Sequence, residues 1–291
     1  MSETRRITLC ADDYGISDGV NRAIRDLIAQ RRLNATSVMV VGPAIGREDA
    51  DALRAVVDNN CEIGLHVTLT APFSPLTMHY RPLDGGMFWP LQRLLRGALL
   101  RRIDADFVES EVKAQITLFR DLFGAPPAYL DGHQHVQLFP GIRDGFIRAA
   151  RETAPDAWAR QCRRAQASSR LGNPKAILLD TLSTTFRKRC AASGLPTNTA
   201  FAGAYDFRKL PDFGSLMRGF LASLPEGGLV MCHPGFVDDT LRALDPLTDQ
   251  RAREHAYLAS EDFPRLLTEL QVSLAKREGA LPQATCHLGE I

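Results

Sequence analysis

The sequence lacks the features that would place the chain in a membrane or on a nucleic acid. Its 291 residues contain no apolar run of about 18 residues, so no segment is long enough to span a bilayer. The 35 basic and 34 acidic side chains leave a formal net charge of +1, whereas nucleic-acid binding needs a concentrated basic surface. The chain starts without an apolar leader, so we expect a cytoplasmic protein.

Closely spaced cysteines are also missing. The six cysteines lie far apart and form no C-x-x-C pair, which excludes a zinc ribbon and a dithiol redox motif. What remains is an ordinary globular composition, with 45% hydrophobic and 24% charged residues. A chain of this length is typical of one α/β barrel.

Short apolar segments alternate with segments of helical period. This alternation predicts parallel βα units, and we expect one domain over 1–291 with a distorted (β/α) TIM-like barrel. A stretch rich in Pro and Gly, 70–100, is expected to be a long inserted loop with a short helix, and 165–213 shows only short, weak patterns. The expected strands are 7–11, 35–41, 62–69, 128–131, 158–162 and 228–232, and the expected helices include 47–59, 106–123, 141–152, 248–259 and 262–275.

Metal-binding and acid–base side chains stand at the ends of four of these strands. The C-terminal ends of parallel barrel strands gather on one face, and that face holds the active site. Each residue also has an ordinary alternative, as a helix cap, a satisfied core histidine or a turn residue. The side chains concerned are Asp12, Asp13, His66, Asp131, His133, His135 and His233.

The segment D-G-H-Q-H is the most specific of these signals. On a strand, His133 and His135 would point to one side together with Asp131, and Gln137 would continue that side. Burying several polar groups on one side is costly unless they bind something. We therefore expect Asp131, His135 and Gln137 to line the substrate site.

One carboxylate with two imidazoles is a common set for a hydrolytic metal site that leaves positions open for water and substrate. Adjacent aspartates cannot share a face in extended structure, so Asp12 and Asp13 suit different roles, one a ligand and one a base. His233 suits protonation of a leaving amine. The donor set fits one divalent ion, zinc or magnesium, without choosing between them.

Four ordered segments resemble the YdjC-like carbohydrate deacetylases. The resemblance implies a divalent metal on Asp13, His66 and His133, with Asp12 as general base and His233 as general acid. It also implies hydrolysis of the N-acetyl group of a sugar, in an oligosaccharide or a glycolipid, by a protein that is often a homodimer. Gln137 departs from the family, which commonly has histidine there. The four segments are ADDYGISDGVNRAI (11–24), IGLHVTLT (63–70), YLDGHQHVQLFP (129–140) and VMCHPGFVD (230–238).

The inserted loop suggests where substrate is recognised. It directly follows the strand with His66, and its Phe88 and Trp89 are expected to contact the sugar or a lipid tail. The alternative is that these rings pin the loop to the barrel or form a dimer contact.

Two other functions remain open from the sequence. One is a different metal-dependent hydrolase, acting on another amide or ester, and the other is a catalytically silent carbohydrate-binding protein. Glycosidase chemistry is not expected, because adjacent aspartates cannot flank a glycosidic bond from both sides.

Overall fold

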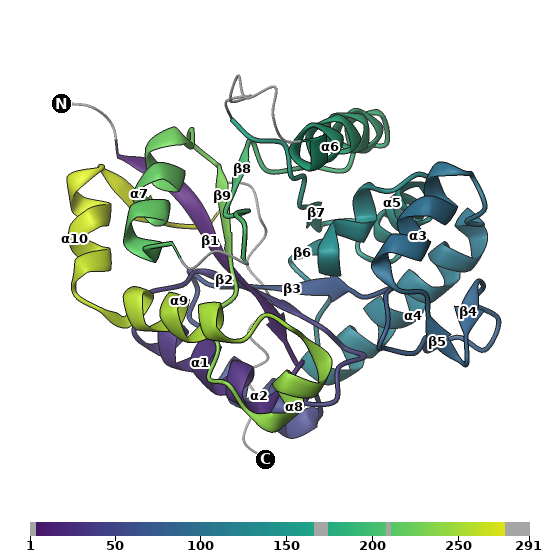
Figure 1. Cartoon of the computed structure of the whole chain (residues 1–291), viewed down its shortest axis with the longest axis horizontal. Helices are drawn as coiled ribbons and strands as arrows, with labels where there is room; N and C mark the ends of the chain where they lie inside the picture. Colours follow the sequence, from purple (N-terminus) through teal and green to yellow (C-terminus); the bar gives the residue numbers. More distant parts are fainter. Residues whose placement is uncertain (1–3, 166–173, 208–210, 277–291) are drawn as a thin grey trace, which may run out of the picture.

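A curled sheet of parallel strands forms the centre of the computed structural model, which describes residues 4–165, 174–207 and 211–276 (Figure 1). The strand order is β7-β6-β3-β2-β1-β9-β8, and β10 pairs with the start of β1. The predicted α/β barrel type is therefore confirmed. The strands are β1 (Arg5–Tyr14), β2 (Ala35–Val38), β3 (Glu62–Val67), β6 (Tyr129–Gly132), β7 (Trp158–Ala159), β8 (Phe201–Ala202), β9 (Leu229–Cys232) and β10 (Val272–Leu274).

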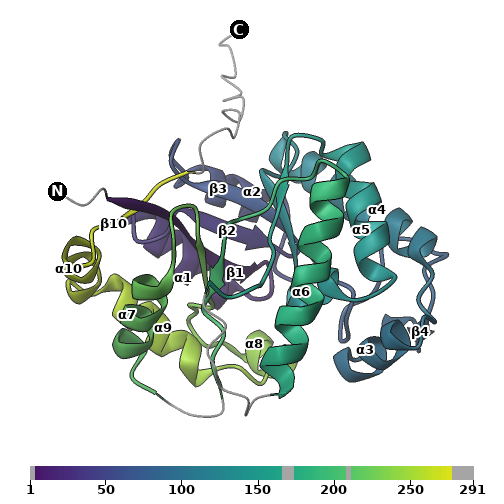
Figure 2. The same cartoon turned by 90° about the horizontal axis from the view of Figure 1, so that it is seen from above.

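Helices surround this sheet, as the view from above shows (Figure 2). Helices with an apolar face pack it on the strands, because their apolar residues repeat at helical spacing. In α1, Ser17 accepts a hydrogen bond from the Val20 amide and so caps the helix, which buries Ile24 and Leu27. The helices are α1 (Asp18–Ala29), α2 (Arg47–Arg54), α4 (Ala105–Phe123), α5 (Ile142–Thr153), α6 (Pro174–Ala192), α7 (Phe213–Ser223), α8 (Asp239–Leu244), α9 (Asp249–Ala259) and α10 (Asp262–Glu269).

The barrel is distorted where its two edges meet. Strands β7 and β8 share no continuous ladder, and two isolated bridges, Ala159 to Thr197 and Arg164 to Phe201, join the edges instead. Strands of two residues leave few backbone groups to pair. The irregular edge lies outside the central strands β1, β3, β6 and β9, whose carboxyl ends carry the predicted site residues.

Several expectations about secondary structure are wrong, and the helix expected over 47–59 already ends at Arg54. The predicted helix 262–275 ends at Glu269, because Gln271 takes a positive φ of 52° and the chain then forms β10. The weakly patterned stretch 165–213 contains the 19-residue helix α6, although short pieces were expected. Consecutive apolar residues in α6, such as Ile177, Leu178 and Leu179, hide the helical period.

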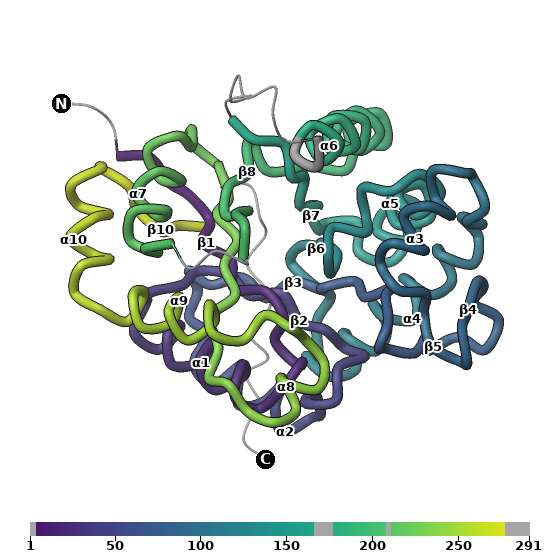
Figure 3. The backbone as a smooth tube through the Cα atoms, viewed as in Figure 1, coloured from purple at the N-terminus to yellow at the C-terminus, as the bar shows by residue number. Residues whose placement is uncertain are grey.

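The predicted insertion contains a hairpin and a helix rather than mainly loop. It comprises β4 (Leu83–Asp84), β5 (Met87–Phe88) and α3 (Leu91–Leu99). The backbone tube shows these elements at one end of the longest axis, opposite α7 and α10 (Figure 3). Along the described ranges, no helix is both long and apolar enough to cross a membrane.

Candidate metal centre and acid–base site

A bulge near the end of β1 sends two adjacent carboxylates in different directions. The pairing with β2 shifts register between Ala11 and Tyr14, and Asp13 has a positive φ of 70°. Such a bulge re-aims side chains, and aspartate tolerates this backbone region better than most residues do. As a result, Asp12 and Asp13 are both buried but contact different partners.

The structure brings Asp13, His66 and His133 together from three strand ends. Asp13 Oδ1 lies 3.0 Å from His133 Nδ1 and 3.3 Å from His66 Nε2. The potential ligand atoms of the three residues all lie within 4.8 Å of one another. His66 Nε2 is buried and has no hydrogen-bond partner among the described residues, which suits an atom that coordinates a cation.

Asp131 holds the other nitrogen of His66. Its Oδ1 lies 2.6 Å from His66 Nδ1, and its Oδ2 accepts a 2.5 Å hydrogen bond from Ser37 Oγ. Burial alone would lower the pKa of His66, but Asp131, Asp12 and Asp13 outweigh it and raise that pKa to about 10. The site therefore favours positive charge at His66 Nε2, and a metal ion would supply that charge in place of a proton.

Asp13 and Asp12 each pair with a different buried arginine. Arg251, on α9, donates from Nη2 to Asp13 Oδ2 at 2.6 Å. Arg160, just after β7, donates from Nη1 and Nη2 to the two oxygens of Asp12 at 2.6 and 2.8 Å. Its Nη1 also lies 3.1 Å from Asp131 Oδ2. Bidentate pairs of this kind fix the orientation of a carboxylate.

These arginines keep both carboxylates ionised. Burial raises the pKa of Asp12, but Arg160, with His66 and His233, lowers it to about 2. For Asp13, burial is again opposed by the guanidinium of Arg251 and by His133, and its pKa falls well below the usual range.

A second group of potential metal ligands is already in contact with an arginine side chain. Cys10, Asp12 and Asp131 also lie close enough together to resemble a metal site. The Arg160 guanidinium contacts both carboxylates of this group, at 2.6 and 3.1 Å, so a positively charged side chain already lies where a cation would bind. The Asp13 group is therefore the candidate metal centre.

His233 lies on the Asp12 side of the site. Its Nε2 is 3.9 Å from Asp12 Oδ2, and its ring meets Phe207 edge to face at a centroid distance of 5.6 Å. Glu254 accepts a 2.5 Å hydrogen bond from the His233 backbone amide and thereby holds the turn after β9. Asp12 and His233 thus face each other beside the Asp13 group.

The assumed strand geometry of D-G-H-Q-H is wrong. Strand β6 ends at Gly132, and a 3₁₀ segment over His133–Leu138 follows, with positive φ at Gln134 and His135. The two histidines therefore do not share one side of a strand. His133 reaches Asp13, whereas His135 Nδ1 lies 3.5 Å from the Cys162 sulfur.

Two polar residues expected to contact substrate are internal supports instead. Asp131 is fully buried between His66, Ser37 and Arg160. Gln137 is also fully buried, and its amide nitrogen donates to the Arg160 carbonyl at 3.1 Å. The structure thus corrects both expectations, because neither side chain has surface to offer a ligand.

The aromatic residues of the insertion are also part of its packing. Phe88 is fully buried and meets Tyr80 edge to face at 5.0 Å. Trp89 donates from its indole nitrogen to the Leu83 carbonyl, and the Arg93 guanidinium lies 4.5 Å from its ring centroid. These contacts match the alternative that the rings pin the insertion, and they correct the expected substrate contact for Phe88.

Different aromatic rings stand next to the site histidines. Phe73 contacts His133 edge to face at 6.0 Å, and the half-buried Phe207 contacts His233. The polar anchor of the loop with Phe73 comes from α4, where Glu111 accepts the amide hydrogens of Leu76 and Thr77 at 3.0 and 2.9 Å.

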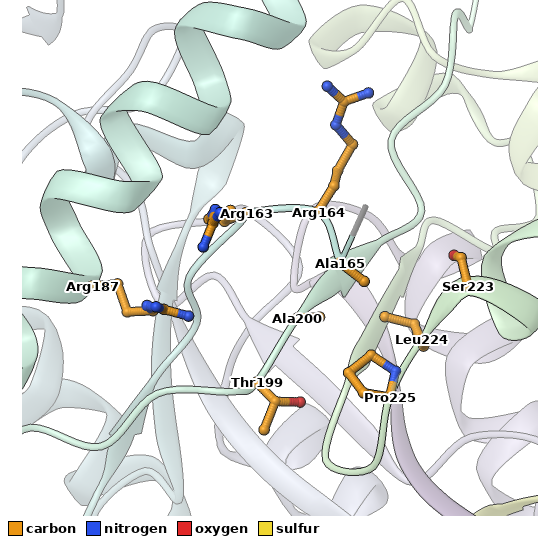
Figure 4. Close-up of a pocket in the computed structure, with 9 residues that line it drawn as sticks. All are labelled: Arg163, Arg164, Ala165, Arg187, Thr199, Ala200, Ser223, Leu224 and Pro225. Atoms are coloured by element: carbon orange, nitrogen blue, oxygen red, sulfur yellow. The ribbon is translucent and has the colours of Figure 1, made fainter. Parts of the chain in front are cut away.

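A separate cavity of about 430 Å³ lies between α6 and α7. Figure 4 shows its basic lining residues Arg163, Arg164 and Arg187, of which Arg164 pairs with Asp180 at 2.7 Å. None of the residues of the candidate metal and acid–base site lines it. This cavity is therefore distinct from the candidate site.

Sequence reasoning missed the two arginines that organise the site. Arg160 directly follows β7 (Trp158–Ala159), but the strand expected over 158–162 put it inside a strand rather than at a strand end. Arg251 lies in a polar helix with no comparable signal, and only the tertiary structure brings it to Asp13.

The fold and site define a parallel α/β barrel with an Asp-His-His centre at its strand ends. The YdjC-like protein family model matches residues 6–269, and the chain belongs to this family, as the four motifs indicated. A chitooligosaccharide deacetylase of Enterobacter sp. (strain 638) is 31% identical over 235 residues, which cover 80% of this chain and 82% of that protein.

A solved structure supports the same fold. The protein comes from Enterococcus faecalis V583 and is named for a proposed cellobiose-phosphate cleavage. It superposes with a TM-score of 0.69 at 21% identity, covering 94% of this chain and 98% of the other. At this identity the likeness concerns the fold alone.

Proposed function

We propose that the protein is a metal-dependent hydrolase that removes the N-acetyl group from an N-acetylated sugar, in an oligosaccharide or a glycolipid. The observation that carries this proposal is Asp13 Oδ1, which faces one nitrogen of His66 and one of His133 at 3.3 and 3.0 Å, beside Asp12 and His233. The name of the 31% identical relative supports the substrate class.

Asp13, His66 and His133 would hold one divalent ion. When bound, such an ion polarises the amide carbonyl and makes water a better nucleophile at neutral pH. The three side chains offer one carboxylate oxygen and two imidazole nitrogens, a set that suits zinc and also accepts magnesium or manganese. Metal analysis of protein purified without chelator identifies the ion.

Asp12 would act as the proton acceptor. It is ionised at neutral pH, and Arg160 holds both of its oxygens so that the carboxylate cannot rotate. As the water oxygen bonds to the acetyl carbon, Asp12 takes the proton that the water loses.

His233 would protonate the leaving nitrogen. The amide C–N bond breaks as its electron pair stays on nitrogen, and a proton from His233 completes the free amine while acetate departs. His233 Nε2 and Asp12 Oδ2 are 3.9 Å apart, which is longer than a hydrogen bond, so one water between them would return the proton to His233 after the product leaves.

The decisive experiment is acetate release from a panel of N-acetylated glycans and glycolipids. We expect release that stops when the metal is removed, returns with a divalent ion and is lost in Asp12→Asn. Release from simple amides or esters but not from any sugar would favour the broader hydrolase alternative. Sugar binding without any release would favour the silent binding protein.

Three finer expectations stay predictions. Light scattering during gel filtration tests the homodimer, and cell fractionation tests the cytoplasmic location. Limited proteolysis tests whether the barrel and its insertion form one domain, which the family match over residues 6–269 supports.

A further inference from the structure

One turn of α9 contacts both halves of the candidate site. Arg251 and Glu254 are three residues apart, so their side chains lie on the same face of the helix. Both are almost fully buried, with 0% and 1% of their surface exposed. Burial of two charged side chains is costly without matched partners, so their contacts indicate what the turn does.

Arg251 contacts one oxygen of Asp13 and leaves the other to the two histidines. Its Nη2 lies 2.6 Å from Asp13 Oδ2 and 2.7 Å from Asp245 Oδ2, while Nε donates to the Leu247 carbonyl at 2.9 Å. Three hydrogen bonds from two nitrogens, Nη2 and Nε, therefore fix the guanidinium. Asp13 Oδ1, in contrast, faces the imidazoles of the proposed metal centre.

We propose that Arg251 is a positioning residue that restricts Asp13 to one-oxygen coordination. This inference rests on the proposed metal centre. Carboxylates bind cations with one or two oxygens, and a second oxygen would occupy a position that a hydrolytic site keeps open for water or substrate. Because Nη2 holds Oδ2, the ion receives Oδ1 alone and keeps that position open.

The same turn also fixes the start of the loop that contains His233. Glu254 Oε2 accepts the backbone amide of His233 at 2.5 Å, and its Oε1 accepts the Tyr205 hydroxyl at 2.6 Å. The Gly235 amide donates to the Arg251 carbonyl at 3.1 Å. Helix α9 thus sets Asp13 and His233 relative to each other through rigid backbone, although only Arg251 touches a proposed ligand.

The test uses the Co²⁺ form of the full chain without substrate. The visible absorption of Co²⁺ weakens as its coordination number rises, so a two-oxygen Asp13 is directly observable. We compare wild type with Arg251→Met, Arg251→Lys and Glu254→Gln, and with Arg253→Met as the matched loss of an exposed arginine from the same helix. Circular dichroism and Tm report folding for each variant.

We expect Arg251→Met to weaken the Co²⁺ absorption and to change metal affinity or kcat by about 10- to 100-fold, the usual cost of losing a partner of a metal ligand. Arg251→Lys keeps the buried charge but not the planar fork, so its spectrum should lie between the two. Glu254→Gln and Arg253→Met should keep the wild-type spectrum. Glu254→Gln should lower kcat, because His233 loses its anchor.

The proposal is overturned if folded Arg251→Met keeps the wild-type spectrum and metal affinity, or if Glu254→Gln changes the spectrum equally. If Arg251→Met does not fold, a wild-type spectrum in Arg251→Lys overturns it as well, because a charge alone then suffices. Wild type that binds one Co²⁺ but releases no acetate refutes the proposed function and leaves this inference standing. Wild type that binds no Co²⁺ refutes both.

Discussion

The strand-end site and the insertion over 70–100 differ in how their polar and aromatic groups are used. At the strand ends, buried charges meet across the barrel from four strands and one distant helix. In the insertion, Phe88 packs on Tyr80, and Glu111 anchors the backbone at Leu76. In this protein, buried charges from distant parts of the chain form the site. The aromatic residues of the irregular insertion instead pack the insertion itself.

The largest expected effect is that of Asp13→Ala on the strand-end site. We expect loss of tight metal binding and of measurable activity with the fold retained, because Arg251 keeps its contact with Asp245. Metal stoichiometry and circular dichroism measure the two effects. Asp18→Ala, which removes an exposed carboxylate of α1, is the control. Normal stoichiometry in Asp13→Ala would end the metal assignment.

Asp12→Asn should distinguish the role of Asp12 from that of Asp13. We expect retained metal and a fall in kcat of about 10²- to 10⁴-fold, the usual cost of losing a general base. Steady-state kinetics and metal analysis on the same sample give both values. If Asp12→Asn loses the metal while Asp13→Asn keeps it, the roles of the two residues are exchanged.

Phe88→Ala tests the insertion as packing rather than recognition. Because Phe88 is fully buried, we expect the free energy of unfolding to fall by about 3–5 kcal/mol while KM stays unchanged. Denaturant titration and kinetics measure the two quantities. If Phe88→Ala raises KM several-fold while its free energy of unfolding stays at the wild-type value, the insertion contacts substrate after all.

His135 should make the stability of the metal-free protein depend on pH. Burial and the nearby Arg160 lower its pKa from 6.5 to about 3. Below pH 6.5 the unfolded chain therefore binds a proton at this histidine that the folded chain does not. The free energy of unfolding should fall by up to about 1.4 kcal/mol for each unit by which the pH is lowered.

Denaturant titrations between pH 6.5 and about 4 measure this slope, since the shifted pKa of Asp12, about 2, acts only below that range. His135→Gln should flatten the slope. An unchanged slope would mean that other groups control stability in this range.

The smallest expected effect concerns Phe207. If this ring contacts the sugar, the substrate is recognised beside His233 rather than at the insertion. Loss of one ring contact with a sugar should cost about 0.5–1.5 kcal/mol, so Phe207→Ala should raise KM roughly 2- to 10-fold with kcat nearly unchanged. Trp89→Ala is the matched control and should leave KM unaltered. Equal KM values for Phe207→Ala and wild type would remove Phe207 from the substrate surface.

Much of the fold could be predicted because parallel strands leave a local signal. Apolar runs such as the one in β1 alternate with helices of clear period, and that alternation identifies the barrel type. Helix α6 was missed because its apolar residues do not fall on one face. The end of α10 was missed because a single positive φ at Gln271 starts a strand.

By itself, the sequence determined which residues could meet, because parallel strands place their carboxyl ends on one face whatever the loops between them do. That geometry brought Asp13, His66 and His133 together. Tertiary structure alone decided how they meet. The bulge in β1 separates Asp12 from Asp13. Arg160 contacts Asp12 although the two are 148 residues apart in the sequence, and Arg251 contacts Asp13 across 238 residues. Such pairing depends on packing between distant elements, which no local period of the sequence records.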